Sequence, residues 1–310
     1  MKTHPGNGVS SAAMVQGLSL RAGKGRSIAQ HGELFQGQIE DHRRERRRCL
    51  VSLPCHAMSS QATFDPDYSC QTAVQPAHKQ KSRKVAEMTL AYLNAPHVGG
   101  VLTIESTIPE SKGYGSSTAD CVSAAIAVAD SCGRTLREAE IAKLVVDAEI
   151  ASDNFMFSHA VLFAHREGVI IEDYARDFPK FEVLGIDTAP EDHVETLKYP
   201  PADYSWRQLQ SFVTLSNALR RGIRAHDLPL LGRVATASAH VNQQFLPKPK
   251  FNELRKIAEY AGAVGVSVAH SGTVVSILLD PDDIRLEYKI DQIMKDFSHL
   301  GISQVLRFRT

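Results

Sequence analysis

The stretch SKGYGSSTAD, residues 111–120, gathers two glycines, three serines, a threonine and a lysine between an apolar run and an alanine-rich run. Glycines let backbone N–H groups approach an anion closely, and a helix that begins there adds the positive end of its dipole. Serine and threonine hydroxyls can reach a phosphate oxygen or Mg²⁺, and Lys112 can add a positive charge. The stretch predicts a phosphate-binding loop, with a surface turn that caps a helix as the alternative. It is neither a Walker A motif nor a GxGxxG fingerprint.

A second group of chemically competent residues is the acidic segment DAEIASDNFMF, residues 147–157. Mg²⁺ in proteins takes one or two carboxylates together with phosphate oxygens and water. The candidate carboxylate ligands in this segment are Asp147, Glu149 and Asp153. Glu149 and Asp153 are four residues apart and share a face if the helix persists. The segment predicts a metal-binding helix end, with a solvated acidic helix end as the alternative.

The elements that must position these residues form a mixed pattern. Residues 99–111 are β-branched and predict a strand that ends at Pro109, and residues 118–132 predict a helix directly after the glycine-serine loop. Residues 135–152 predict another helix, capped by Thr135 with Glu138. The later segments predict helices over 205–222, 228–245, 251–262 and near 290–298, and strands within 159–174, 181–188, 263–280 and 303–308. Because strands and helices do not alternate strictly, an α+β fold is expected.

Composition excludes several classes of protein. The chain has 310 residues, 43% hydrophobic and 23% charged, with a formal net charge of +0, so no overall field favours nucleic acid or an anionic membrane. Five cysteines without a CxxC spacing argue against a disulfide framework or a zinc site. The sequence shows no membrane-spanning run and no signal peptide, so a cytoplasmic protein is expected. The arginine-rich run 43–48 predicts a solvated hairpin loop, and residues 1–26 predict a poorly ordered lead-in.

Three motifs together resemble those of a known enzyme superfamily. The segment IPESKGYGSSTAD resembles the second motif of the GHMP kinases, P-x-x-x-G-[LM]-[GA]-S-S-[AST], with Tyr114 where Leu or Met is common. QHGELFQG (30–37) is similar to the first motif, and GVSVAHSGTVVSIL (265–278) stands where the third belongs, although it is poorer in glycine. GELFQG, KGYGSSTAD and VAHSGTVV together look like the L-threonine kinases that serve cobalamin assembly.

The resemblance implies a two-lobed GHMP kinase fold, with an ATP-binding N-terminal domain over 27–185 and a ferredoxin-like C-terminal domain over 186–310. It implies transfer of the γ-phosphoryl group of ATP, with Mg²⁺, to the hydroxyl of L-threonine, which gives L-threonine O-3-phosphate for cobalamin biosynthesis. Homoserine, L-serine or a sugar is the alternative acceptor, and a non-catalytic ligand-binding relative is the alternative class. No nucleic acid or membrane partner is expected, and the sequence is compatible with a homodimer.

The resemblance also implies roles for individual residues. Phosphate binding is expected from Gly113, Tyr114, Gly115, Ser116, Ser117 and Thr118. Metal binding is expected from Ser117 and Glu149, and catalytic roles from Lys112, Ser116 and Asp153, with Asp153 as the candidate base. The acceptor pocket is expected to be lined by His31, Gly32, Glu33, Gln36, His270 and Ser271, with Glu33 meeting the substrate ammonium.

Overall fold

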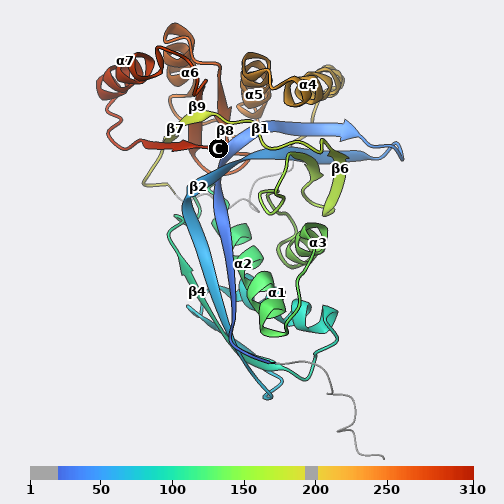
Figure 1. Ribbon diagram of the computed structural model, residues 1–310. Helices are drawn as coiled ribbons and strands as arrows, with labels where there is room; N and C mark the ends of the chain where they lie inside the picture. The colour runs from blue at the N-terminus through green and yellow to red at the C-terminus, as the bar shows by residue number, and fades with distance from the viewer. Residues whose placement is uncertain (1–19, 193–201) are drawn as a thin grey trace, which may run out of the picture.

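The computed structural model describes residues 20–192 and 202–310, which form two lobes joined by a continuous sheet (Figure 1). The first lobe and the long strands contain β1 (Gly23–Glu40), β2 (Arg46–Asp67), β3 (Thr72–Gln75), α1 (Gln80–Tyr92), β4 (Gly99–Ser106), α2 (Ser116–Ser131), α3 (Glu138–Glu149), β5 (Val161–Ala164) and β6 (Val169–Asp173). The second lobe contains β7 (Glu182–Asp187), α4 (Trp206–Ala225), α5 (Leu228–Asn242), α6 (Phe251–Tyr260), β8 (Gly265–Val268), β9 (Val274–Leu279), α7 (Leu286–His299) and β10 (Leu306–Arg309).

The sheet runs in the order β10-β7-β9-β8-β1-β2-β4-β3, and β5 and β6 extend from β2 at its side. β1 and β2 form an antiparallel pair whose register runs from Gly23 opposite Phe64 to Glu40 opposite Arg46. Register shifts interrupt this pair between Ile28 and Phe35. Such bulges bend a strand and redirect its side chains, and both long strands pass from one lobe into the other (Figure 1).

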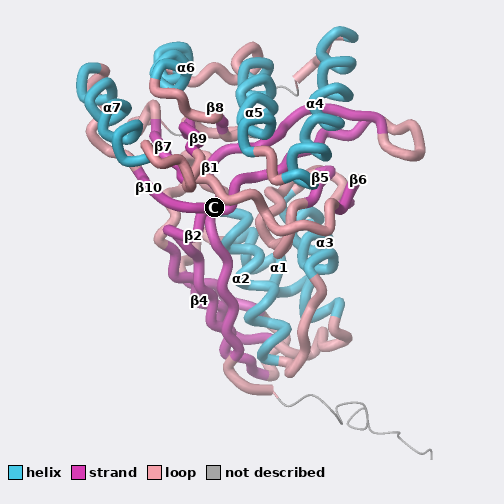
Figure 2. The backbone as a smooth tube through the Cα atoms, turned by 45° about the horizontal axis from the view of Figure 1, so that its top comes forward, coloured by secondary structure: helices cyan, strands magenta, loops and turns pink. Residues whose placement is uncertain are grey.

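In the N-terminal lobe, helices pack on one face of the sheet (Figure 2). α2 is rich in alanine, and its small side chains let it lie close to β1 and β2. Its buried residues share a core with Phe64 and Leu102 of the sheet. Burial of this apolar face fixes the position of the α2 N-terminus, where the glycine-serine loop ends.

In the C-terminal lobe, β7 to β10 lie in the order β10-β7-β9-β8, with helices inserted after β7 and after β9. This is the split βαβ order of a ferredoxin-like layer, so the expected fold class is confirmed. α6 and α7 share a core with Leu184, Val266 and Ile277 of the strands. The turn between β8 and β9 points to the first lobe, where it meets the loop before α2.

Several local expectations are corrected. The lead-in expected over 1–26 lies largely outside the described residues, but 23–26 belong to β1 because they pair with β2. The cap of α3 is formed by Arg137 and Glu140, not by Thr135 and Glu138. The arginine-rich run does contain the hairpin turn between β1 and β2, where Arg47 bonds to Asp41. None of the described helices is long and apolar enough to cross a membrane.

Candidate active site

The glycine-serine loop joins β4 to α2 in a conformation that requires its glycines. Gly113 has φ +97° and Gly115, the N-cap of α2, has φ +72°, which is left-handed backbone that favours glycine. A Cβ on Gly113 would lie 2.4 Å from the carbonyl oxygen of Ser271, and one on Gly115 would lie 2.8 Å from Oδ2 of Asp153. The loop is therefore pressed against both the β8–β9 turn and the acidic segment.

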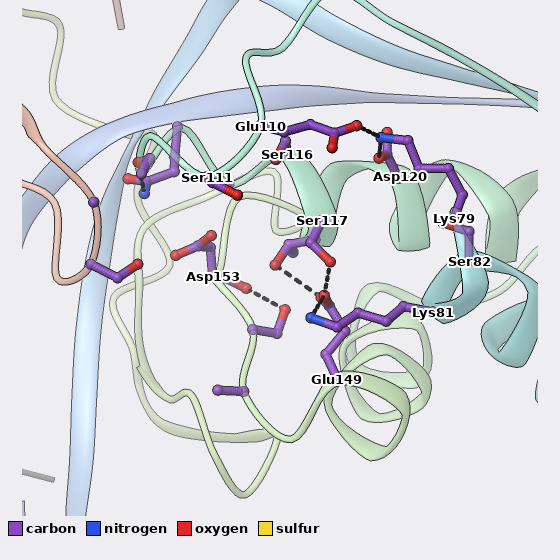
Figure 3. Close-up of a pocket in the computed structure, with 18 of the residues that line it drawn as sticks. Lys79, Lys81, Ser82, Glu110, Ser111, Ser116, Ser117, Asp120, Glu149 and Asp153 are labelled. Carbon is purple, nitrogen blue, oxygen red and sulfur yellow. Dashed lines mark hydrogen bonds and ion pairs between the residues drawn. The ribbon is translucent and has the colours of Figure 1, made fainter. Parts of the chain in front are cut away.

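The first turn of α2 presents N–H groups and hydroxyls that can bind an anion. Ser116, Ser117 and Thr118 are its first residues, and the first N–H groups of a helix have no intrahelical acceptor. The hydroxyl of Ser117 donates to Oε1 of Glu149, and the hydroxyl of Thr118 donates to Oε2 of Glu149 at 3.1 Å. The hydroxyls of Ser117 and Thr118 thus meet one carboxylate, and Figure 3 shows Ser117 facing Glu149.

Glu149 is the last residue of α3, and its carboxylate is buried. Burial raises its pKa, opposed by the charge of Lys81, whose Nζ lies 3.4 Å from Oε1. Hydroxyl and carboxylate oxygens that face one cavity are the ligands Mg²⁺ prefers alongside phosphate oxygens. The donors of Ser117, Thr118 and Glu149 therefore fit a magnesium ion that accompanies a nucleotide.

Two lysines at the start of α1, Lys79 and Lys81, line the same cavity as Ser116 and Ser117, and the sequence analysis does not predict either of them. Nζ of Lys79 lies 2.6 Å from Oδ2 of Asp120 and 2.5 Å from Oε1 of Glu110. Lys81 reaches Glu149 from the same end of α1 (Figure 3). The available signal is the cluster of three lysines and one arginine over residues 79–84, which matches no phosphate-binding motif.

The opposite side of the site is formed by Glu33, Asp153 and His270. Nδ1 of His270 lies 2.8 Å from Oε1 of Glu33 and 3.5 Å from Oδ1 of Asp153. One potential ligand atom from each residue lies within 4.8 Å of the other two. Three segments far apart in the chain, β1, the segment after α3 and the β8–β9 turn, therefore meet at one point.

Burial controls the protonation of this cluster. Burial raises the pKa of Asp153 to about 7, the charges of Glu33 and Glu149 add to the effect, and His270 opposes it. Burial disfavours protonation of His270, yet its hydrogen bond to Glu33 and the charge of Asp153 raise its pKa. A carboxyl group that titrates near neutrality is suited to accept a proton during catalysis.

Both sides open into one cavity of about 410 Å³. Of the residues expected from the sequence, those that line it are Gly113, Gly115, Ser116, Ser117, Thr118, Glu149, Asp153, His270 and Ser271. Glu33 lies directly behind His270, with its side chain fully buried. A volume of this size is in the range of small-ligand sites.

Two residues of the loop face away from the cavity. Nζ of Lys112 donates to the carbonyl oxygen of Pro190, 2.5 Å away, and to that of Asp192, beyond β7. The ring of Tyr114 is buried edge-on against His31, with ring centroids 5.1 Å apart, and burial raises the pKa of its hydroxyl. Neither side chain lines the cavity, and the expected catalytic role of Lys112 and the expected phosphate contact of Tyr114 stay predictions.

Three residues of the first motif are also structural. Nδ1 of His31 lies 2.6 Å from Oγ of Ser276, and burial lowers the pKa of His31 to about 4. Gln36 is buried, donates to the carbonyl oxygen of Val268 at 3.0 Å and accepts from the Asn242 amide. Gly32, at φ +83°, lies in the bulged part of β1. None of the three lines the cavity, and their expected acceptor contacts stay predictions.

Comparison with known proteins places this site in a class. The chain matches the GHMP kinases N terminal domain over residues 81–160 and the GHMP kinases C terminal domain over residues 219–290. It is 31% identical over 270 residues to an L-threonine kinase of Salmonella typhimurium, with 84% of each chain covered. The chain therefore belongs to the GHMP kinase superfamily, and it is an ATP-dependent kinase of a small alcohol substrate.

Two further proteins are similar to this chain, one in sequence and one in structure. An L-threonine kinase of Citrobacter freundii is 30% identical over 280 residues, covering 83% of this chain and 86% of that protein. The structure of a homoserine kinase from Cytophaga hutchinsonii matches with a TM-score of 0.70 at 15% identity, covering 93% of this chain and 94% of that chain. This chain, which carries the first two motifs and the β8–β9 turn, is thus similar to L-threonine kinases along most of its length.

Proposed function

We propose that this kinase phosphorylates the hydroxyl group of an amino acid, and that the amino acid is L-threonine. The observation that carries the proposal is the cluster of Glu33, Asp153 and His270 beside the phosphate loop. Asp153 lines the cavity and can receive an ammonium group, Glu33 adds negative charge from behind His270, and the His270 cation can meet a carboxylate. A sugar or a plain alcohol has no use for such a pair of charges. The names of the two threonine kinase relatives support the same acceptor.

On the nucleotide side, the N–H groups of Ser116 and Ser117 would hold the phosphates at the α2 N-terminus. Lys79 and Lys81 would add positive charge from α1. Mg²⁺, held by Ser117 and Glu149, would neutralise the developing charge on the phosphates when it is bound. The protein's task is then to hold the γ-phosphoryl group in line with the acceptor oxygen.

On the acceptor side, Asp153 is the group placed to take the proton. The acceptor oxygen forms its bond to the γ-phosphorus as the bond from that phosphorus to the β–γ bridging oxygen breaks. The proton of the acceptor hydroxyl passes to a carboxylate oxygen of Asp153, and ADP leaves with its negative charge. With a pKa of about 7, Asp153 is substantially ionised at neutral pH and still basic enough to accept this proton.

The product of this reaction would be L-threonine O-3-phosphate. The similarity to threonine kinases extends the proposal to a role in cobalamin biosynthesis and to a cytoplasmic location. Homoserine and L-serine carry the same ammonium and carboxylate groups, so the charged cluster does not distinguish them from L-threonine. Only the shape of the acceptor end of the cavity can distinguish these amino acids, and the relative turnover on each of them reports how well it fits.

The test is ATP consumption with Mg²⁺ against L-threonine, L-serine, L-homoserine, galactose and mevalonate. We expect turnover on L-threonine to exceed that on every other acceptor by at least about tenfold in kcat/KM, the range that one added or missing methylene can supply. Greater turnover on L-serine or L-homoserine would overturn the threonine assignment and keep the amino-acid class. Turnover on galactose or mevalonate alone would overturn both.

Two variants of α3, each with one carboxylate replaced by an amide, distinguish loss of metal binding from a general structural effect on the helix. Glu149→Gln removes the charge that faces Ser117 and Thr118, and we expect kcat to fall by at least about a thousandfold, in line with the loss of a main electrostatic group. Asp147→Asn alters an exposed residue two positions earlier that pairs with Lys143, and it should leave kcat unchanged. Equal losses in both variants would contradict the metal role of Glu149.

A further inference from the structure

Lys248 is a buried lysine that no motif assigned to the site. It lies in the segment between α5 and α6, flanked by Pro247 and Pro249, and only 4% of its surface is exposed. Its backbone N–H donates to Oε1 of Gln243 at 2.7 Å, and its Nζ donates to the carbonyl oxygen of Gly272 at 2.6 Å. Because prolines restrict the backbone on both sides, the lysine side chain is directed inward from a rigid segment.

The acceptor of this bond, Gly272, belongs to the turn that touches the phosphate loop. The N–H of Thr273 donates to the carbonyl oxygen of Lys112 at 2.9 Å. A Cβ on Gly272 would lie 2.2 Å from that same oxygen, so the two backbones are in direct contact. Lys248 therefore holds, from the C-terminal lobe, the turn that braces the phosphate loop of the N-terminal lobe.

Lys248 also interacts electrostatically with the site, through Glu33. Burial lowers its pKa to about 7, and the negative charge of Glu33 opposes that shift. Glu33 itself is fully buried, and its Oε2 makes no hydrogen bond within the described part of the chain. A buried carboxylate is stabilised by a nearby cation, and in return it keeps a buried lysine protonated.

We infer that Lys248 is a positioning residue for phosphoryl transfer: its ammonium group holds the Ser271–Gly272 turn against the phosphate loop and balances the charge of Glu33 behind His270. The titratable groups that face it are Glu33 of β1 and His270 of the turn. On its outer side, His240, Lys250 and Glu253 line a surface hollow with it. Loss of its proton leaves Glu33 without this partner and weakens the hold on the turn.

The test compares three variants over about pH 6 to pH 9, with whichever acceptor the wild-type enzyme phosphorylates, so it does not depend on the acceptor being L-threonine. Wild-type kcat/KM for the acceptor should decline on the alkaline side as Lys248 loses its proton. Lys248→Arg keeps a cation that does not deprotonate in this range, so we expect the decline to disappear while most activity remains. Lys248→Met should lower kcat/KM by at least about tenfold at every pH and also lack the alkaline decline.

Lys250→Met is the matched control. Lys250 lies two residues away, is exposed, and its Nζ likewise donates to a backbone carbonyl, that of Leu300 at 2.9 Å. This variant should keep the wild-type activity and pH profile. An alkaline decline that persists unchanged in Lys248→Arg would overturn the inference, and so would wild-type kcat/KM in Lys248→Met. If Lys248→Met does not fold, the pH profile of Lys248→Arg alone decides.

Discussion

The phosphate side and the acceptor side of the cavity use charge in different ways. On the proposed phosphate side, half of the Lys81 side chain lies in solvent. The side chain of Lys79, which pairs with Glu110, is 12% exposed. On the acceptor side, Glu33 is 0% and Asp153 6% exposed. Solvent and salt screen the charge of Lys81, whereas burial shifts the protonation of Asp153. Salt dependence should therefore report on nucleotide binding, and pH dependence on the acceptor side.

On the acceptor side, the largest effect should follow removal of the proposed base. Asp153→Asn keeps the shape of the side chain but removes the proton acceptor, so kcat should fall by about 10² to 10³. In the wild type, kcat should rise with pH through about 7, because Asp153 must be ionised to accept the proton. The measurement is a pH–rate profile of both proteins, with Asp147→Asn as the control. A variant that retained kcat and the acidic limb would assign that limb to another group.

The same variant gives a stability signal of known sign. Folding raises the pKa of Asp153 from 3.8 to about 7, so the folded state binds its proton more tightly than the unfolded state. The stability that this contributes is present below about pH 4 and is lost as pH rises through about 7. Wild-type unfolding free energy, measured in urea, should therefore fall relative to Asp153→Asn across that window.

A smaller effect is expected on the phosphate side. Lys81→Met removes a half-exposed charge beside the proposed metal ligand, so KM for ATP should rise by about tenfold while KM for the acceptor stays the same. The difference from wild type should shrink as salt is added, because exposed charges are screened. Lys84→Met, an exposed lysine on the same helix that bonds to the carbonyl oxygen of Ala148, is the control. An equal rise in both variants would contradict a specific phosphate contact.

The two sides also differ in how far the sequence could predict them. Ser116, Ser117 and Thr118 follow glycines at the start of a helix, and that local pattern specifies both the backbone and the chemistry. The place of Glu149 beside them is implied by the resemblance to GHMP kinases, because an acidic helix end alone does not show what it faces. Lys79 and Lys81 were missed because only the packing of α1 against α2 brings them to the cavity.

The acceptor side depends on long-range register. Bulges between Ile28 and Phe35 decide which side chains of β1 turn to the site, and no spacing in the sequence reveals a bulge. Glu33 therefore meets His270, whereas His31, two positions earlier, enters the core. Lys248 reaches the turn from a segment whose sequence carries no catalytic pattern. The fold class was accessible because the order of helices and strands does not depend on such one-residue shifts.

The smallest catalytic effect should come from His31, which tests the boundary between site and core. His31→Gln should leave KM for ATP and acceptor within about twofold, because its ring packs on Tyr114 and Phe308 outside the cavity. Its effect should appear in stability. Folding lowers its pKa from 6.5 to about 4, so the stability present above pH 6.5 is lost as pH falls through about 4. At about 1.4 kcal/mol per tenfold, that interval corresponds to about 3 kcal/mol. Wild-type unfolding free energy should drop by about that amount relative to the glutamine variant over this window, and a flat difference would contradict the burial of the His31 ring.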